Sequence, residues 1–256
     1  MLASLADAPL ADPQLVYEPK YDGIRVIAEI GGGRVSVQRR ETRPRVRLWS
    51  RLGNEKTHQF PEIAAAFATW ARTLAAPVIL DGEIVALDRK GEPTGFQQLQ
   101  RGIHPAAFVA FDILREGTTD LRHRPLLERR AVLERMFNSA TGGHPPSSAI
   151  LRISEMAHSD GRALYARALA SGWEGVIAKR ADSLYQSGKR TPDWRKLKIV
   201  HEQEFVVGGW TEPRHTRSHF GALLLGVYEP PDDHRRNRGE RRESSLSARS
   251  APSAVR

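Results

Sequence analysis

One lysine occupies a position that could do chemistry. Lys20 lies in the segment EPKYDGIR, between two apolar runs and beside Asp22 and Gly23. Most lysines between strands are simply exposed, so Lys20 alone predicts little. Its meaning depends on what other segments bring to it.

Two carboxylates occur in apolar surroundings. Glu83 lies in LDGEIVAL and Glu174 lies in WEGVIAK, so both are predicted inside apolar strands. A buried carboxylate is costly unless it has a partner or a ligand. A structural salt bridge is one explanation. The other is a ligand site, because carboxylate oxygens bind divalent cations.

Two further lysines alternate with apolar residues. In DWRKLKI, Lys196 and Lys198 alternate with Leu197 and Ile199. The period of two places both ammonium groups on one face of a strand, although a charged edge strand is also common. Together with Lys20 they would form a cationic site for phosphates. Neighbouring cations also favour the neutral, nucleophilic form of a lysine amine.

The elements that must position these residues follow from hydrophobic patterns. Residues 20–23 are predicted to form a tight turn between two strands, and segment 35–49 is predicted to form strands with a loop. One helix is predicted to begin at Pro61, and two others are predicted at 125–137 and 161–171. Residues 138–149 are predicted to form a linker. Strands are predicted at 15–18, 24–30, 78–87, 107–114, 150–154, 173–179, 194–200, 204–210 and 221–228.

Composition narrows the class of protein. The 256 residues carry a net charge of +9, which favours a polyanionic partner such as nucleic acid. Residues 231–256 hold seven Arg against four Asp or Glu, so this segment contributes +3 and leaves +6 for the rest. The absence of cysteine excludes disulfides and thiolate chemistry. With no long apolar run and no signal-peptide pattern, we expect a cytoplasmic bacterial protein that does not bind membranes.

The motifs, taken in order, resemble a known family. KYDGIR at 20–25 resembles the nucleophile motif of the covalent nucleotidyltransferases, which include ATP-dependent DNA ligases, RNA ligases and capping enzymes. The segment EFVVGGWTEPRHTRSHFGALLLG is most similar to the ligase module of the bacterial ligase D family. Further motifs follow in the family's order: SRLGN at 50–54 with FPEI at 60–63, LDGEIV at 80–85, FVAFDIL at 108–114, EGVIAK at 174–179 and WRKLK at 194–198.

The resemblance implies roles in nucleotide binding. Lys20 would carry AMP as a phosphoramide, and Glu18 would read the amino group of adenine. Phe111 would stack on the base. Arg25 and Arg51 would contact ribose or phosphate, with Arg51 also able to orient the 5′-phosphate of a nick.

The resemblance also implies a phosphate and metal site. Lys196 and Lys198 would bind the α-phosphate of ATP. Glu83 would bond ribose or a metal-bound water, and Glu174 would help to position Mg²⁺ or Mn²⁺. Asp112 is expected to be structural.

The fold implied by the resemblance is α+β. It has a nucleotidyltransferase (adenylation) domain of antiparallel sheets with flanking helices over 1–200. A partial OB-fold would cover 201–230, followed by a disordered basic tail over 231–256. Family members continue into a five-stranded OB-fold, so the two strands found here suggest a truncated end and a weakened first step.

The implied function is that of an ATP-dependent DNA ligase, which forms a lysyl-AMP intermediate and seals nicks in double-stranded DNA during repair and recombination. The expected protein is a monomer, with end-joining factors or a separate polymerase as candidate partners. One alternative is an RNA ligase or a capping-type transferase. Another is a truncated remnant that binds nucleotide or DNA without ligating.

Overall fold

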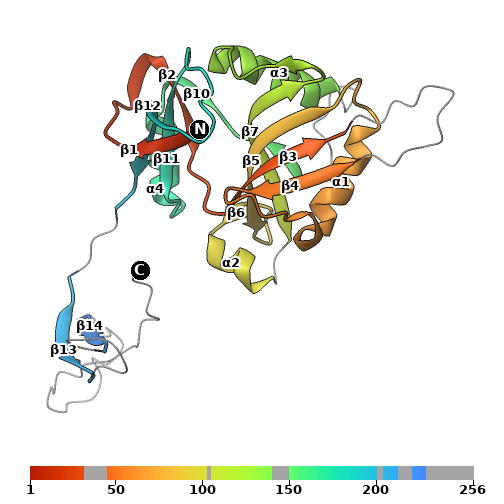
Figure 1. The fold of residues 1–256 in the computed structure, drawn as a ribbon. Helices are drawn as coiled ribbons and strands as arrows, with labels where there is room; N and C mark the ends of the chain where they lie inside the picture. Colours follow the sequence, from red (N-terminus) through yellow and green to blue (C-terminus); the bar gives the residue numbers. More distant parts are fainter. Residues whose placement is uncertain (32–44, 103–104, 140–149, 201–203, 213–220, 229–256) are drawn as a thin grey trace, which may run out of the picture. The chain divides into compact units, whose positions relative to one another are not determined.

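The computed structural model describes residues 1–31, 45–102, 105–139, 150–200, 204–212 and 221–228. The chain divides into two compact units, residues 1–199 and 200–256. The first unit contains two β-sheets with flanking helices (Figure 1). In the second, strands β13 (Val206–Trp210) and β14 (Leu223–Gly226) pair in antiparallel fashion.

The larger sheet has seven strands. Its order is β4-β3-β5-β7-β8, with β6 paired to β5 and β9 paired to β7. The β7–β9 pair is parallel, and the other strand pairs of this sheet are antiparallel. The strands are β3 (Ile24–Ile30), β4 (Val46–Ser50), β5 (Val78–Leu87), β6 (Pro93–Thr94), β7 (Ala106–Glu116), β8 (Thr119–Asp120) and β9 (Leu151–Ile153).

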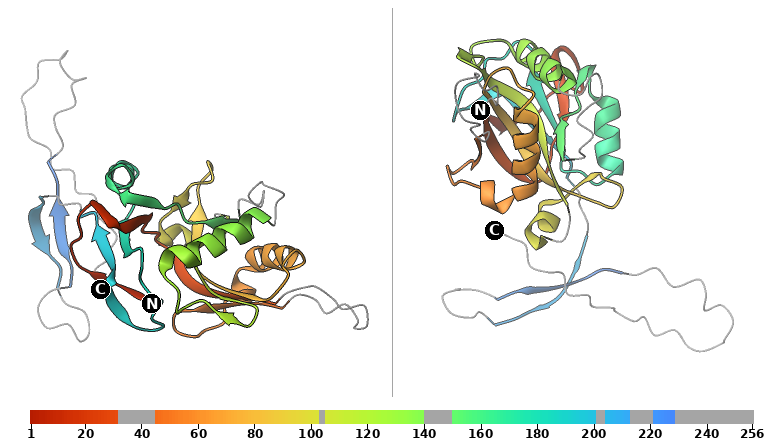
Figure 2. Two further views of the ribbon diagram at one scale, coloured as in Figure 1. Left: turned by 90° about the horizontal axis from the view of Figure 1, so that it is seen from above. Right: turned by 90° about the vertical axis from the view of Figure 1, so that its right-hand side faces the viewer.

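Helices α1 (Pro61–Ala71) and α3 (Leu126–Ser139) cover one face of this sheet (Figure 2). Pro61 stands at the start of α1, where its missing N–H costs nothing. Phe67 of α1 and Leu133 of α3 join Val26 of β3 in the main core. The 3-10 helix Thr57–Gln59 precedes α1, and α2 (Phe96–Arg101) follows β6.

The smaller sheet has five strands in the order β1-β12-β11-β2-β10. Helix α4 (Arg162–Ala170) covers one face and buries Leu164 and Ala168 against Tyr17 and Val176. The β1–β12 pair is parallel. The strands are β1 (Leu2–Leu5), β2 (Ala11–Pro19), β10 (Ala157–Asp160), β11 (Gly175–Arg180) and β12 (Arg190–Lys198).

The remaining faces of the two sheets meet in a small apolar cluster. Trp194 of the smaller sheet belongs to it, together with Leu114, Ile27 and Phe111 of the larger sheet. Side chains in a strand alternate between two faces. Residues on either side of Ile27 along β3 therefore point toward the helices, while Ile27 points toward the smaller sheet.

The predicted helices and most predicted strands are confirmed, within a few residues at their ends. Strands β1, β6, β8 and β10 and helix α2 were not predicted, because they are short and lack a clear apolar period. Of segment 35–49, the part after residue 44 forms β4. The rest of that segment, most of the linker at 138–149 and the tail at 231–256 lie outside the described residues.

The prediction of a tight turn at residues 20–23 is wrong. Strands β2 and β3 belong to different sheets, so this segment crosses from one sheet to the other. Gly23 is required by the crossing. A Cβ atom on Gly23 would lie 2.1 Å from the carbonyl oxygen of Ile84 in β5. The glycine therefore lets the chain run directly against the larger sheet.

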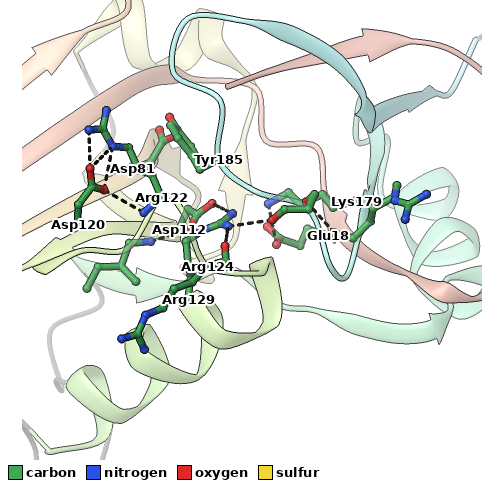
Figure 3. Close-up of polar contacts among 12 residues, drawn as sticks. Glu18, Asp81, Asp112, Asp120, Arg122, Arg124, Arg129, Lys179 and Tyr185 are labelled. Carbon is green, nitrogen blue, oxygen red and sulfur yellow. Dashed lines mark hydrogen bonds and ion pairs between the residues drawn. The ribbon is translucent and has the colours of Figure 1, made fainter.

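A buried ion pair fixes α3 to the larger sheet. The Arg129 guanidinium donates two hydrogen bonds of 2.8 Å to the Asp112 carboxylate, and both side chains are fully buried (Figure 3). Arg129 also donates to the carbonyl oxygens of Arg124 and Ser183. The segment after β11 is thereby attached to β7, and Asp112 has the structural environment expected of it.

We expect Arg129→Met to lower the free energy of unfolding by about 3–5 kcal/mol, because the substitution leaves the Asp112 carboxylate buried without its partner. Arg135→Met is the matched control on the same helix, since the Arg135–Glu116 pair is exposed and should contribute less than about 1 kcal/mol. Urea unfolding of both variants measures the difference. Equal, small losses would contradict the importance assigned to the buried pair.

Candidate active site

A cavity of about 210 Å³ lies between the two sheets of the first unit. It receives side chains from both sheets and from the segment that joins β2 to β3. The predicted site residues that line it are Glu18, Lys20, Arg25, Arg51, Glu83, Phe111 and Lys196. Lys179, Arg190 and Trp194 also line it, and sequence reasoning did not single them out.

The smaller sheet presents its side chains to the cavity in rows. Ile177 of β11 lies opposite Glu18 of β2 on one side and opposite Lys196 of β12 on the other. In the next row Lys179 lies opposite Trp194. Because side chains alternate, the intervening residues of these strands point toward α4 instead.

The larger sheet contributes an aromatic ring through a β-bulge. Gly82 of β5 pairs with Ala110, whereas Asp81 pairs with Asp112, so Phe111 is the extra residue between them. Bulges redirect side chains next to functional sites. Phe111 consequently lines the cavity, where Glu83 lies opposite Arg25 on the neighbouring strand.

Lys20 follows directly after β2 and is held at both ends. Its backbone N–H donates to the carbonyl oxygen of Gly175 at 3.0 Å, and its ammonium group donates to the Glu174 carboxylate. Glu174 also lies 3.6 Å from the ammonium of Lys198. The structure therefore brings Glu174 and Lys198 beside Lys20, although neither lines the cavity itself.

The prediction that Glu174 is buried inside an apolar strand is wrong. Glu174 precedes β11, and its side chain is 35% exposed. The apolar residues that follow it belong to the strand. Glu174 is therefore accessible to a ligand without the desolvation cost that the sequence pattern suggested.

A buried ion pair joins β2 and β11. The Lys179 ammonium lies 2.7 Å from the Glu18 carboxylate, and the two side chains are 3% and 2% exposed (Figure 3). The ammonium is 4.3 Å from the ring centroid of Trp194 and 4.8 Å from that of Phe111. Burial lowers the pKa of Lys179, opposed by the charge of Glu18. The alternation of Lys179 with Ile177 was the sequence signal for its position.

A second ion pair holds Arg25 at the wall of the cavity. Its guanidinium donates to both carboxylate oxygens of Asp81, at 3.0 and 2.6 Å. The Tyr185 hydroxyl donates to the same carboxylate at 2.7 Å. Burial, followed by the charge of Asp81, raises the pKa of Tyr185, which therefore remains a hydrogen-bond donor. Arg25 is thus positioned rigidly, 5.4 Å from the centroid of Phe111.

The remaining charged groups face the cavity with few contacts. Arg51 follows β4 and is exposed. Among the described residues, no hydrogen bond or ion pair holds the Glu83 carboxylate, and burial raises the pKa of Glu83 to about 8 despite nearby Arg25. Burial and then the charge of Lys20 lower the pKa of Lys196. Cations and carboxylates are thus brought together around an accessible space.

The predicted metal ligands lie on different sides of the site. Glu83 comes from β5 and Glu174 from the segment before β11. The part of the chain that the structure describes contains no cluster of three His, Cys, Asp or Glu side chains arranged for a metal ion. Their role toward a metal stays a prediction.

None of the described helices is both long enough and apolar enough to cross a bilayer.

Comparison with known proteins identifies the family. Residues 1–198 match the family model described as the ATP dependent DNA ligase domain. The chain is 38% identical, over 91% of its length, to the multifunctional non-homologous end joining protein LigD of Pseudomonas aeruginosa. It is 31% identical, over 85% of its length, to DNA ligase C of Mycobacterium tuberculosis, of which it covers 59%. The chain therefore belongs to the ATP-dependent DNA ligase family.

Solved structures agree with this assignment. The ligase domain of M. tuberculosis LigD matches with a TM-score of 0.64 and 34% identity, covering 90% of this chain and 68% of that one. A mycobacterial DNA ligase D complexed with ATP matches with a TM-score of 0.63 and 35% identity, covering 90% of this chain and 67% of that one. The chain spans about a quarter of the length (26%) of the P. aeruginosa LigD protein. The mixed, sheet-rich fold is thus that of ligase nucleotidyltransferase domains.

The raised pKa of Glu83 makes a prediction about stability. The folded protein favours the protonated carboxyl, so this contribution to stability is fully present below about pH 4.5 and is lost as the pH rises through about 8. Glu83→Gln imitates the protonated form. It should match wild type near pH 5 and be more stable near pH 9, by on the order of 2 kcal/mol.

Urea unfolding at the two pH values measures this effect. Glu62→Gln, which changes an exposed carboxylate on α1, is the control and should show no such gain. A Glu83→Gln variant that is less stable than wild type at pH 9 would show that the Glu83 carboxylate has an ionic partner.

Proposed function

We propose that this chain is the adenylation part of a DNA ligase that uses ATP to modify Lys20 and then seals nicks in double-stranded DNA. The observation that supports this most is the position of Lys20 at a cavity lined by Lys196, Arg25 and Glu83. A nucleophile, phosphate-binding cations and a carboxylate are what lysyl-AMP chemistry needs in one place.

In the proposed reaction the neutral amine of Lys20 attacks the α-phosphorus of ATP. A P–N bond forms, the bond from that phosphorus to the bridging oxygen breaks, and pyrophosphate leaves. The 5′-phosphate of the nick then displaces Lys20 and receives AMP. Finally the 3′-hydroxyl attacks the 5′-phosphorus and AMP is released. Each step depends on positioning and charge neutralisation.

The chain's own residues divide this work. Lys196 and Lys198 would neutralise the α-phosphate, and Arg51 would orient the 5′-phosphate of the nick. Glu174, which accepts a hydrogen bond from the Lys20 ammonium, would be one of the residues that hold the metal. Phe111 would stack on adenine, and Arg25 would contact the ribose.

The donor set fits Mg²⁺ or Mn²⁺. Mg²⁺ is commonly held by one or two carboxylates together with phosphate oxygens and water. Glu83 and Glu174 would be these carboxylates. The metal would neutralise phosphate charge. No third carboxylate is required, because the nucleotide supplies oxygen ligands.

The proposal extends to domains and partners. Residues 1–200 would form the adenylation domain, and β13 and β14 would begin an OB-fold over 201–230 that contacts DNA. The end-joining name of the LigD relatives supports a role in repair with end-joining factors. The similarity to DNA ligases disfavours the RNA ligase and capping-type alternatives.

Incubation with ATP and Mg²⁺ should add the mass of one AMP to the protein, because Lys20 forms a covalent phosphoramide. The adduct should be stable to base and labile to acid. Intact-mass analysis of wild type, Lys20→Ala and Lys90→Ala measures it. Lys90 is an exposed lysine outside the cavity, so its variant should label normally. Equal labelling of Lys20→Ala would refute the assignment of the nucleophile.

Lys20→Ala should also separate the steps of the reaction. It should fail on an ordinary nick with ATP, yet still seal a nick that already carries AMP on its 5′-phosphate, because that substrate no longer needs the lysine nucleophile. Gel analysis of labelled nicked DNA measures both. If wild type binds ATP and DNA but seals neither substrate, the chain is a nucleotide-binding remnant and the ligase proposal is wrong.

A further inference from the structure

We infer that the edge strand β4 carries a binding surface for one strand of DNA, the strand that bears the 5′-phosphate of the nick. The surface consists of Arg45, Arg47 and Trp49, and it leads away from Arg51 at the cavity. This inference rests on the proposed function and adds to it a DNA contact outside the cavity.

Alternation along β4 places two of these side chains on one face. Leu48 is buried in the main core, on the side of the sheet that the helices cover. Arg47 and Trp49 flank Leu48 and therefore point to the opposite face. That is the face of Ile27, which lies opposite Trp49 on β3. Both Arg47 and Trp49 are half-buried, so each keeps part of its side chain accessible.

The same period extends the surface at both ends of β4. The Gly31 N–H donates to the carbonyl oxygen of Arg45, which continues the β3–β4 ladder by one residue. Arg45 and Arg51 are exposed, and Arg51 also lines the cavity. Each step of two residues is about 6.6 Å at roughly 3.3 Å per residue. Successive phosphates of a DNA strand are separated by a similar distance, so a strand anchored at Arg51 would continue along this surface.

The Arg47 guanidinium keeps its hydrogen-bond donors available. It lies 5.6 Å from the ring centroid of Trp49. Glu29 lies opposite Arg47 on β3, and Glu55 lies opposite Trp49 and accepts a hydrogen bond from Thr57. Within the described part of the chain, no hydrogen bond or ion pair engages the Arg47 side chain. The two carboxylates therefore leave Arg47 able to bind an anion.

An arginine that stacks on an indole ring suits a sugar–phosphate strand. The guanidinium is planar and weakly hydrated, and its forked donors match two oxygens of one phosphate. The Trp49 ring would offer a flat apolar surface to a deoxyribose. Contacts of this kind fix the position of a duplex without reading its sequence. The 5′-phosphate at Arg51 would thus be followed by a ring and then by the two guanidinium groups of Arg47 and Arg45.

The alternative is that these charges only keep the edge strand from pairing with other chains. Binding to nicked DNA with a 3′-dideoxy end, which cannot be sealed, separates the two roles. Arg47→Gln should weaken binding about 5- to 20-fold and reduce the slope of log K against log salt by about 0.9. Arg47→Lys keeps the charge and should keep most of the slope. Arg72→Gln is the matched control, because Arg72 is exposed at the end of α1, and it should bind as wild type does.

Neutral linkages identify the strand that β4 binds. A methylphosphonate replaces, one at a time, each of the first three phosphates after the 5′-phosphate, or the corresponding phosphates on the 3′-hydroxyl side of the nick. One replacement in the first set should weaken binding by wild type and cause no further loss in Arg47→Gln. Equal losses in both proteins at every position would overturn the inference, as would such coupling only on the 3′-hydroxyl side.

A second readout keeps the inference separate from the proposed function. Arg47→Gln should form the AMP adduct at the wild-type rate, because Arg47 does not line the cavity. If wild type forms no adduct, the proposed function fails, while the methylphosphonate comparison still decides the role of Arg47. The inference is wrong if wild type does not bind nicked DNA, if Arg47→Gln binds it as tightly as wild type, or if Arg47→Gln forms the adduct slowly.

Discussion

The charges buried between the two sheets are the constraint on which the rest of the first unit depends. Lys179 and Glu18 are paired within the smaller sheet, and Arg25 and Asp81 within the larger one. Tyr185, from the segment between β11 and β12, reaches across to Asp81. Buried charges are tolerated only with close partners. A shift of a strand by one residue would turn these charged groups toward the apolar cores. The buried charges therefore fix the register of the strands.

The same constraint explains why a nucleotide site lies there. The outer faces of the sheets are covered by α1, α3 and α4 and carry the main cores. The inner faces share only a small apolar cluster, which leaves room for a cavity with charged walls. Cations gather near Lys20. Phe111 and the Glu18–Lys179 ion pair lie farther from Lys20. Phosphate and base would thus meet different chemistry in one space.

Much of this arrangement can be predicted from the sequence, because the period of two in strands is visible in the chain. This period placed Lys196 and Lys198 on one face of a strand. The apolar pattern around Glu83 indicated that burial of its carboxylate would be costly. The errors came from long-range geometry. Residues 20–23 look like a hairpin turn, but their neighbours lie in different sheets. Asp112 and Arg129 are 17 residues apart, and nothing local shows that they pair. Lys179 is the last residue of the predicted strand 173–179, and nothing local in the sequence shows that it pairs with Glu18.

The most direct test of this account is a crystal structure of the protein bound to a non-hydrolysable ATP analogue. The account predicts the nucleotide in the cavity between the two sheets, with its α-phosphate within hydrogen-bonding distance of Lys20 and Lys196 and its base against Phe111, edge toward Glu18. Nucleotide bound outside this cavity, or in the reverse direction with its phosphates at Glu18, would contradict it.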